Sequence, residues 1–321
     1  MKIVDVFDFD GSFIDHFHRF AGGNPVVLLV NKIDLLPDDV SFVRIEKWIR
    51  TEARHRGLEP VAVHLVSAHS GLNLKKVAES IESLRGDRDL FIMGQSNVGK
   101  SSLVNRLWPL LNKQSVGKPA VTVSQVPGTT VATIGMPFPD GHVFYDTPGI
   151  MAEEGLTRVL SMEDYLRSQP KKRVTPRLQG VPVGSTLFIG GFARIDYLAG
   201  PPHVNLVVYA SPEVKLTRVR TEEADLFYDR HSNGNLFDPI ATSTQSPDAP
   251  KRILLEERSV RKYECTDGYN RASVDLVFAG LGWVAVAANG TVQLRSWYLP
   301  RCVVGDRSPL IPFDVIKKKD K

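Results

Sequence analysis

The sequence predicts an α/β fold for residues 1–150 and a β-rich α+β fold for residues 181–316. Apolar strand-like segments alternate with amphipathic helical segments in the first half, and polar or glycine-rich motifs directly follow several of the strands. The second half contains mostly short strand-like segments separated by turn residues. A chain of 321 residues is long enough for two such domains.

Apolar runs and helical periodicity define the elements of the first half. Residues 41–56 carry apolar side chains at helical spacing among charged ones, which indicates an amphipathic helix. The other expected helices are Leu74–Leu84 and one that begins with Ser101–Leu107. The expected strands are Lys2–Phe7, Pro25–Val30, Val61–Val66, Leu90–Met93 and Val143–Tyr145.

The second half is expected to be mainly strands. Residues 151–180 are polar and contain Pro170 and Pro176, which predicts a linker that is mostly irregular or helical, and residues 317–321 form a basic tail. Asn289-Gly290 favours a type I′ hairpin, Glu222–His231 a helix, and residues 232–250 a loop. The expected strands are Ser185–Leu198, Val204–Ala210, Val274–Phe278, Trp283–Ala288 and Thr291–Trp297.

Composition excludes several classes of protein. No run of about 18 apolar residues is present, so the sequence predicts no membrane span. Cys265 and Cys302 lie far apart and outside any CxxC pattern, which predicts neither a zinc site nor a disulfide framework. Residues 1–150 hold 16 basic and 16 acidic side chains, so the net charge of +4 arises in the second half. An RNA-facing surface and an ordinary solvated surface both fit this small excess.

The segment Gly94-x4-Gly99-Lys100-Ser101 matches a phosphate-binding loop and lies between an expected strand and an expected helix. Its glycines allow backbone N–H groups to converge on phosphate oxygens at a helix N-terminus. Lys100 is expected to reach the β- and γ-phosphates, and the Ser101 hydroxyl to ligate Mg²⁺. The residues expected to contact the nucleotide phosphates are Gly94, Asn97, Val98, Gly99, Lys100, Ser101 and Ser102.

Two further motifs predict that the base is guanine. In Asn31-Lys32-Ile33-Asp34, the Asp34 carboxylate can accept hydrogen bonds from the N1–H and 2-amino groups of guanine. The apolar stem of Lys32 can lie along the base plane. Ser67-Ala68 follows the next strand and is expected to offer backbone N–H groups to guanine O6.

Asp146-Thr147-Pro148-Gly149 is expected to read the γ-phosphate and the metal. Asp146 would hold the Mg²⁺ shell, and the Gly149 N–H would meet the γ-phosphate. Thr130 is the expected switch threonine and Thr129 the alternative. The expected Mg²⁺ ligands are therefore Ser101, Thr130 and Asp146, and the expected catalytic residues are Lys100, Asn97, Thr130 and Gly149.

The order of these motifs differs from that of an ordinary GTPase, in which the phosphate loop comes first and the base-reading motifs last. Here the base-reading motifs at Asn31 and Ser67 precede the phosphate loop, the switch threonine and Asp146–Gly149. The sequence therefore predicts a circularly permuted GTPase domain that binds GTP, GDP and Mg²⁺. Residues 85–89 would bridge the original ends, and the new cut falls just after Gly149.

Two positions bear on the rate of hydrolysis. Ile150 follows Gly149 where Ras-like enzymes carry the glutamine that orients the attacking water, so intrinsic hydrolysis is expected to be slow. Asn97 occupies the position at which potassium-activated GTPases carry an asparagine, and a K⁺ ion held there would supply positive charge. The alternative role for Asn97 is to stabilise the loop only.

The motif order, Asp8–Ser12, Asn31–Pro37, Phe188–Tyr197 and Gly280–Trp283 together resemble the YqeH family of circularly permuted GTPases. The resemblance covers nearly the whole chain. It implies a GTPase that assists assembly of the small ribosomal subunit, with the second half contacting RNA or protein. It also implies a chloroplast or mitochondrial location for a eukaryotic member and a cytoplasmic one for a bacterial member.

Family members usually carry a cysteine-rich zinc-binding segment before the GTPase domain, and this chain has none, which fits a fragment or a truncated gene model. A GTP-dependent RNA-binding scaffold with negligible hydrolysis is the alternative function, because of Ile150. In the second half, Arg194 and Asp196 are expected to form an ion pair and Trp283 to be a core residue rather than a base-stacking platform.

Overall fold

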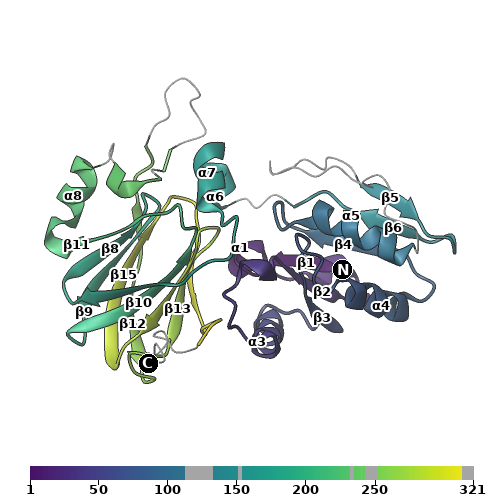
Figure 1. Ribbon diagram of the computed structural model, residues 1–321, viewed down its shortest axis with the longest axis horizontal. Helices are drawn as coiled ribbons and strands as arrows, with labels where there is room; N and C mark the ends of the chain where they lie inside the picture. Colours follow the sequence, from purple (N-terminus) through teal and green to yellow (C-terminus); the bar gives the residue numbers. More distant parts are fainter. Residues whose placement is uncertain (113–132, 151–153, 232–234, 240, 243–251, 313–321) are drawn as a thin grey trace. The chain divides into compact units, whose positions relative to one another are not determined.

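The computed structural model describes residues 1–112, 133–150, 154–231, 235–239, 241–242 and 252–312 (Figure 1). It divides into two compact units, Met1–Ala152 and Glu153–Lys321.

A mixed six-stranded sheet forms the centre of the first unit. The strand order is β3-β2-β1-β4-β6-β5, and all neighbours are parallel except the antiparallel edge pair β5 and β6. The strands are β1 Lys2–Asp5, β2 Val27–Asn31, β3 Ala62–Leu65, β4 Leu90–Gly94, β5 Ile134–Pro137 and β6 Val143–Asp146.

Helices cover both faces of this sheet. The chain moves outward from β2 to β3 and then back to β4, and right-handed crossovers therefore put the two connecting helices on opposite faces. On one face of the sheet, apolar side chains of the strands pack against Val77 and Ile81 of one helix and against Leu103 and Leu107 of another. The helices are α1 Phe9–Ser12, α2 His18–Ala21, η1 Ile33–Leu35, α3 Phe42–His55, α4 Leu74–Arg85 and α5 Lys100–Leu111.

The strand register brings the sequence motifs to one edge of the sheet. Asp5 at the end of β1 pairs with Asn31 at the end of β2, and Ile3 pairs with Gly94. Ile92 pairs with Asp146. Because these strands are parallel, their carboxyl ends meet, and this is the edge at which open α/β sheets bind ligands.

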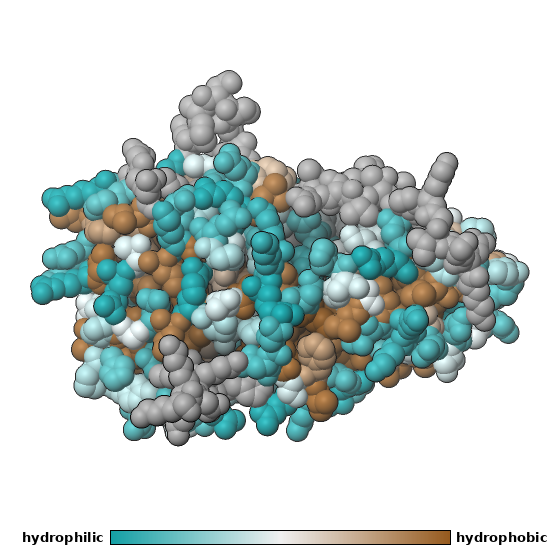
Figure 2. Space-filling model, viewed as in Figure 1, coloured by the Kyte–Doolittle hydropathy of each residue, from teal (hydrophilic) through white to brown (hydrophobic). Residues whose placement is uncertain are grey.

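Two antiparallel five-stranded sheets make up most of the second unit. Its surface, at the left of Figure 2, carries many hydrophilic residues with hydrophobic ones between them. Both sheets contribute to one apolar core, for example through Leu206 and Val284 of the first and Ile195 and Leu294 of the second. One sheet has the order β16 (Val304–Arg307), β13 (Val274–Phe278), β14 (Gly282–Ala287), β10 (His203–Ala210), β7 (Arg177–Pro182). The other has the order β11 (Leu216–Arg220), β8 (Ser185–Ile189), β9 (Ala193–Ala199), β15 (Gly290–Tyr298), β12 (Glu256–Cys265).

Short helices accompany these sheets. Phe188 of β8 packs against Tyr228 and Phe237, so α8 and η3 lie over the outer side of that strand. The helical elements are α6 Leu156–Val159, α7 Met162–Ser168, η2 Thr221–Glu223, α8 Ala224–Arg230 and η3 Asn235–Phe237.

The expected combination of an α/β first half with a β-rich second half is confirmed, but one expected strand is wrong. Ser185–Leu198 is not a single strand, because Gly190 (φ +55°) turns the chain between β8 and β9. A side chain at Gly190 would approach the Val214 side chain and the Pro239 carbonyl, so the turn requires glycine. The expected linker, residues 151–180, contains α6, α7 and the first residues of β7. The expected tail, residues 317–321, lies outside the described residues.

Several expectations concern single residues of the second unit. Arg194 Nε lies 2.6 Å from Asp196 Oδ1, and both side chains are buried. Trp283 is also buried, and its ring stacks on that of Tyr209. Cys265 and Cys302 are buried and do not form a disulfide. Within the described residues no cluster of three His, Cys, Asp or Glu could hold a metal ion, and no helix is long and apolar enough to cross a membrane.

Candidate nucleotide-binding site

Asn31 connects the three parts of the candidate site. It ends β2, is buried, and its Nδ2 donates to the Val98 carbonyl in the phosphate loop at 2.8 Å. Its Oδ1 accepts a hydrogen bond from the Ala68 N–H at 2.9 Å. One amide side chain therefore fixes the base-reading motif against both the phosphate loop and the Ser67-Ala68 segment.

Asp34 lies in η1, one turn after Asn31, and its Oδ1 is buried without a hydrogen-bond partner among the described residues. A buried carboxylate oxygen without a partner is costly, so such an atom indicates a ligand that donates hydrogen bonds. The N1–H and 2-amino groups of guanine are donors of this kind. The position of Asp34 therefore fits the expected base.

Lys32 is held by an acid that the sequence analysis missed. Its Nζ lies 2.6 Å from Asp5 Oδ2, and Lys32 itself adopts a left-handed backbone conformation at φ +65°. Asp5 is the last residue of β1 and pairs in register with Asn31. The available signal was an acidic residue near the end of the first expected strand, Lys2–Phe7, since the ends of parallel strands meet at one edge.

The Ser67-Ala68 segment is arranged differently from the expectation. The Ser67 N–H donates to the Leu72 carbonyl, and the Ala68 N–H donates to Asn31 Oδ1. The Ser67 hydroxyl accepts from the Ser70 N–H and shapes the turn. Recognition of guanine O6 at this segment therefore requires the Ala68 N–H to be shared with Asn31 or released by it.

The phosphate loop joins β4 to α5, and two of its glycines are required by close approach. A Cβ at Gly99 (φ +87°) would lie 2.4 Å from Asn31 Nδ2. A Cβ at Gly94 would lie 2.5 Å from the Ile3 side chain. Ser101 and Ser102 follow in the first turn of α5, where orphan N–H groups and the helix dipole favour an anion.

Lys100 and Asp146 form a buried ion pair at the centre of the site. Lys100 Nζ lies 2.6 Å from Asp146 Oδ1, and both side chains are almost completely buried. Asp146 Oδ2 has no hydrogen-bond partner among the described residues. An oxygen of this kind is a suitable partner for a hard cation or for its water shell, so the residues present fit Mg²⁺.

The segment after Asp146 is hydrogen-bonded to the phosphate loop through its backbone. The Ile150 N–H donates to the Gly94 carbonyl at 3.0 Å, and the Ser96 N–H donates to the Ile150 carbonyl at 3.1 Å. A Cβ at Gly149 would lie 2.9 Å from Ser96 Oγ. This backbone pairing, which sequence reasoning did not anticipate, ties Gly149 and Ile150 to the phosphate loop.

The remaining expected residues divide into two groups. Asn97 lies in the phosphate loop with a left-handed backbone at φ +69°, a conformation that asparagine tolerates better than most residues. This geometry fits the loop-stabilising role, and it leaves the role in K⁺ binding as a prediction. Thr129 and Thr130 lie outside the described residues.

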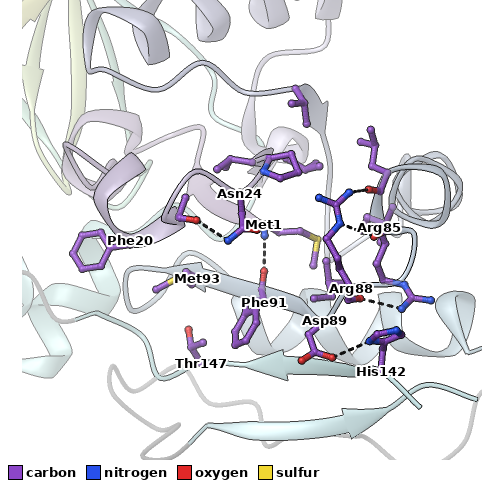
Figure 3. Close-up of a pocket in the computed structure, with 18 of the residues that line it drawn as sticks. Met1, Phe20, Asn24, Arg85, Arg88, Asp89, Phe91, Met93, His142 and Thr147 are labelled. Atoms are coloured by element: carbon purple, nitrogen blue, oxygen red, sulfur yellow. Dashed lines mark hydrogen bonds and ion pairs between the residues drawn. The ribbon is translucent and has the colours of Figure 1, made fainter. Parts of the chain in front are cut away.

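A separate cavity of about 760 Å³ lies near the amino ends of the strands (Figure 3). Phe91, Phe20 and Val27 contribute to its apolar lining, and Arg88 and Asp89 lie at its polar side. Of the motif residues that the structure describes, Thr147 alone lines it. The cavity is therefore distinct from the candidate nucleotide site.

Comparison with known proteins agrees with this geometry. Residues 10–155 match the RsgA GTPase family, and residues 203–304 match the YqeH-like C-terminal family. The chain is 36% identical over 286 residues to a Bacillus subtilis protein described as uncharacterized protein YqeH, covering 89% of this chain and 74% of that protein. This chain belongs to the YqeH family.

Other relatives of this YqeH-family chain match less of their own length. It is 30% identical to the Arabidopsis thaliana GTP-binding protein Brassinazole Insensitive Pale Green 2, chloroplastic, covering 97% of this chain and 49% of that protein. It is 35% identical to the small ribosomal subunit biogenesis GTPase RsgA of Mannheimia succiniciproducens, covering 39% of this chain and 33% of that protein. The chain thus spans about half or less of the length of these two relatives.

Proposed function

We propose that this YqeH-family chain is a GTP-binding switch that hydrolyses GTP slowly and assists assembly of the small ribosomal subunit. The proposal rests on the buried side chain of Asn31. It hydrogen-bonds to Val98 of the phosphate loop and to Ala68, and so links both to the base-reading motif. The partner is suggested by the relative whose name describes a small ribosomal subunit biogenesis GTPase.

In this proposal, separate side chains bind the base, the phosphates and the metal. The Asp34 carboxylate accepts the donors of guanine, and Lys32, fixed by Asp5, lies beside the base. Lys100 leaves Asp146 and moves its ammonium to the β- and γ-phosphates, which provide a stronger anionic partner. Asp146 and the Ser101 hydroxyl would then hold Mg²⁺, which neutralises phosphate charge when bound.

The switch follows from the order of the motifs, which we propose to reflect a circular permutation. Gly149 is the expected γ-phosphate sensor, and the second unit begins at Glu153, a few residues further along the chain. GTP would order Thr130 and shift the Asp146–Ile150 segment, which is already hydrogen-bonded to the phosphate loop, and this change would be passed directly to the second unit. Hydrolysis would reverse it and release the assembly intermediate.

Ile150 sets the rate in this proposal. Its apolar side chain cannot orient the attacking water molecule, and its backbone is hydrogen-bonded to the backbone of Gly94 and Ser96. The alternative function, a GTP-dependent scaffold with negligible hydrolysis, rests on the same residue. Multiple-turnover GTPase assays with and without purified small subunits separate the two, with Lys100→Ala as the inactive control. Stimulation by small subunits supports the switch, whereas an unchanged basal rate contradicts it and supports the scaffold.

A further inference from the structure

One stretch of the second unit carries basic side chains but no acidic ones. Residues 165–193 contain five Lys or Arg side chains and no Asp or Glu. Three of the basic residues, Lys171, Lys172 and Arg173, are adjacent and exposed. This stretch contributes a large part of the positive charge that the sequence analysis found in the second half.

The fold places a second basic segment beside the first. β7 and β11 are edge strands of different sheets, and the Arg218 guanidinium in β11 donates to the Gly180 carbonyl in β7. Arg177 of β7 donates to the carbonyls of Val214 and Ser211, in the loop that leads into β11. We call residues 165–184 and 211–220 together the basic edge.

The basic edge carries a strong excess of positive charge. Its eight basic residues face a single acid of its own, Glu213, which pairs with Lys171 and Arg167. Two acids from outside the edge, Asp238 and Glu222, also form ion pairs with it. The eight are Arg167, Lys171, Lys172, Arg173, Arg177, Lys215, Arg218 and Arg220.

The way the arginines are fixed preserves their charge. Arg177 and Arg218 hydrogen-bond to backbone carbonyls, which orient the guanidinium groups without neutralising them. Arg218 and Arg220 are both exposed, and they lie two residues apart on a strand, about 7 Å along it. Arg220 shares its charge with Glu222, whereas the two arginines bound to carbonyls keep theirs, and a row of oriented cations of this kind fits a line of phosphate groups.

The apolar groups of the edge narrow the class of partner. Tyr165 is its single aromatic residue and is buried, so the edge offers no platform on which an unpaired base could stack. The exposed apolar side chains, Leu178 and Val183, are aliphatic. Contacts to backbone phosphates without stacking are typical of proteins that bind folded, double-stranded RNA.

We propose that the basic edge, formed by β7, β11 and the segment before β7, binds the phosphate backbone of folded RNA. The inference rests on the proposed function and deepens it, because it identifies the surface and the chemical group through which the ribosomal subunit is contacted. The contact is independent of RNA sequence.

The test compares two charge reversals of equal size in the full chain. Lys172→Glu/Arg220→Glu changes two exposed residues of the basic edge. Lys262→Glu/Arg271→Glu changes two exposed residues of the same unit that lie outside the edge and serves as the matched control. Both variants are first required to give the circular dichroism spectrum and GTP affinity of the parent chain.

Binding to an RNA duplex of about 20 base pairs is measured as a function of salt, alongside co-sedimentation with small subunits. We expect the edge variant to lose about tenfold or more in duplex affinity and to lower the slope of log K against log[salt] by about 1–2, with the control within about twofold of the parent.

Equal binding by the two variants overturns the inference. Loss of subunit binding with unchanged duplex binding also overturns it, in favour of an acidic protein surface. If the parent chain itself does not bind small subunits, the proposed function fails instead.

Discussion

The Asp5 carboxylate holds the Lys32 ammonium at 2.6 Å, which links the end of β1 to the base-reading motif that follows β2. The other carboxylate oxygen of Asp5 accepts the Phe7 N–H at 2.9 Å, so the acid is itself oriented. A long lysine side chain has many rotamers, and a fixed partner reduces the entropy lost when a base binds beside it. Under the proposed function, Asp5 is therefore a positioning residue for the nucleotide.

Replacing Asp5 by Asn tests this role with little change in shape. The neutral amide cannot hold the ammonium by charge, so we expect GDP and GTP to bind about three- to tenfold more weakly. Isothermal titration calorimetry measures both affinities, with the exposed Asp87→Asn as the matched control. Equal nucleotide affinities of Asp5→Asn and the control would show that nucleotide binding does not depend on the ion pair between Asp5 and Lys32.

Asp34→Asn tests the assignment of the base. The amide presents a donor where the carboxylate accepts, so it is matched to xanthine, which carries a carbonyl in place of the 2-amino group. We expect GTP affinity to fall by about 100-fold and xanthosine triphosphate to become the preferred ligand. Competition with a fluorescent nucleotide gives both constants. Unchanged GTP affinity would contradict the placement of the site.

The two roles of Asn97 are separated by Asn97→Gly. Glycine adopts the left-handed conformation at this position without strain, so the substitution removes the side-chain oxygen and leaves the backbone geometry intact. If that oxygen helps to hold K⁺, the parent chain turns over GTP faster in KCl than in NaCl and the variant does not. Equal rates of the parent in both salts would eliminate the cation, and GTP affinity serves as the control for loop integrity.

The sequence allowed the positions of the motif residues on the first sheet to be predicted more fully than the strands of the second unit. Phosphate- and base-reading motifs are short and contiguous. Asn31 and Asp146 end parallel strands, and Asp34 and Lys100 lie in the segments that directly follow β2 and β4, so all four come to the same edge of the sheet. Asp5 was missed because its role depends on strand register, which a single strand pattern does not reveal.

In the second unit, several strands gave too weak a pattern to be predicted. β12 (Glu256–Cys265) is an edge strand with many charged residues, and β11 and β16 are short, so none shows the apolar run of a central strand. The first residues of β7 were assigned to a linker because residues 151–180 are polar and contain Pro170 and Pro176. Proline is nevertheless tolerated at edge strands, and Pro182 is itself the last residue of β7. Edge strands were therefore missed where the central strands β10 and β14 were found.

Lys2 predicts a dependence of stability on pH. Its side chain is fully buried, with Nζ 2.7 Å from the Ile14 carbonyl and 3.2 Å from the centre of the Phe13 ring. Burial lowers the pKa of Lys2 to about 7, opposed by Asp15 and assisted by Arg56. Between pH 7 and the ordinary lysine pKa the unfolded chain thus binds more protons than the folded chain, and this group makes stability rise with pH.

Lys2→Met removes that dependence while keeping an unbranched side chain. We expect the variant to be more stable than the parent near pH 7 and below, and the difference to shrink steadily toward pH 10. Thermal melting across this range measures it, with the exposed Lys75→Met as the control. A difference that stays constant with pH would show that the Lys2 amine keeps its ordinary pKa in the folded chain.

Co-sedimentation shows whether this chain is a guanine-nucleotide switch that acts on the small ribosomal subunit. The full chain is spun with purified small subunits in the presence of GDP, GTP or a non-hydrolysable GTP analogue, each with Mg²⁺, and Asp34→Asn serves as the variant defective in guanine binding. We expect the chain to pellet with small subunits in the GTP-analogue state, GDP to release it, and Asp34→Asn to respond to xanthine but not to guanine nucleotides. Subunit binding that is absent, or that is the same with every nucleotide, would contradict this function.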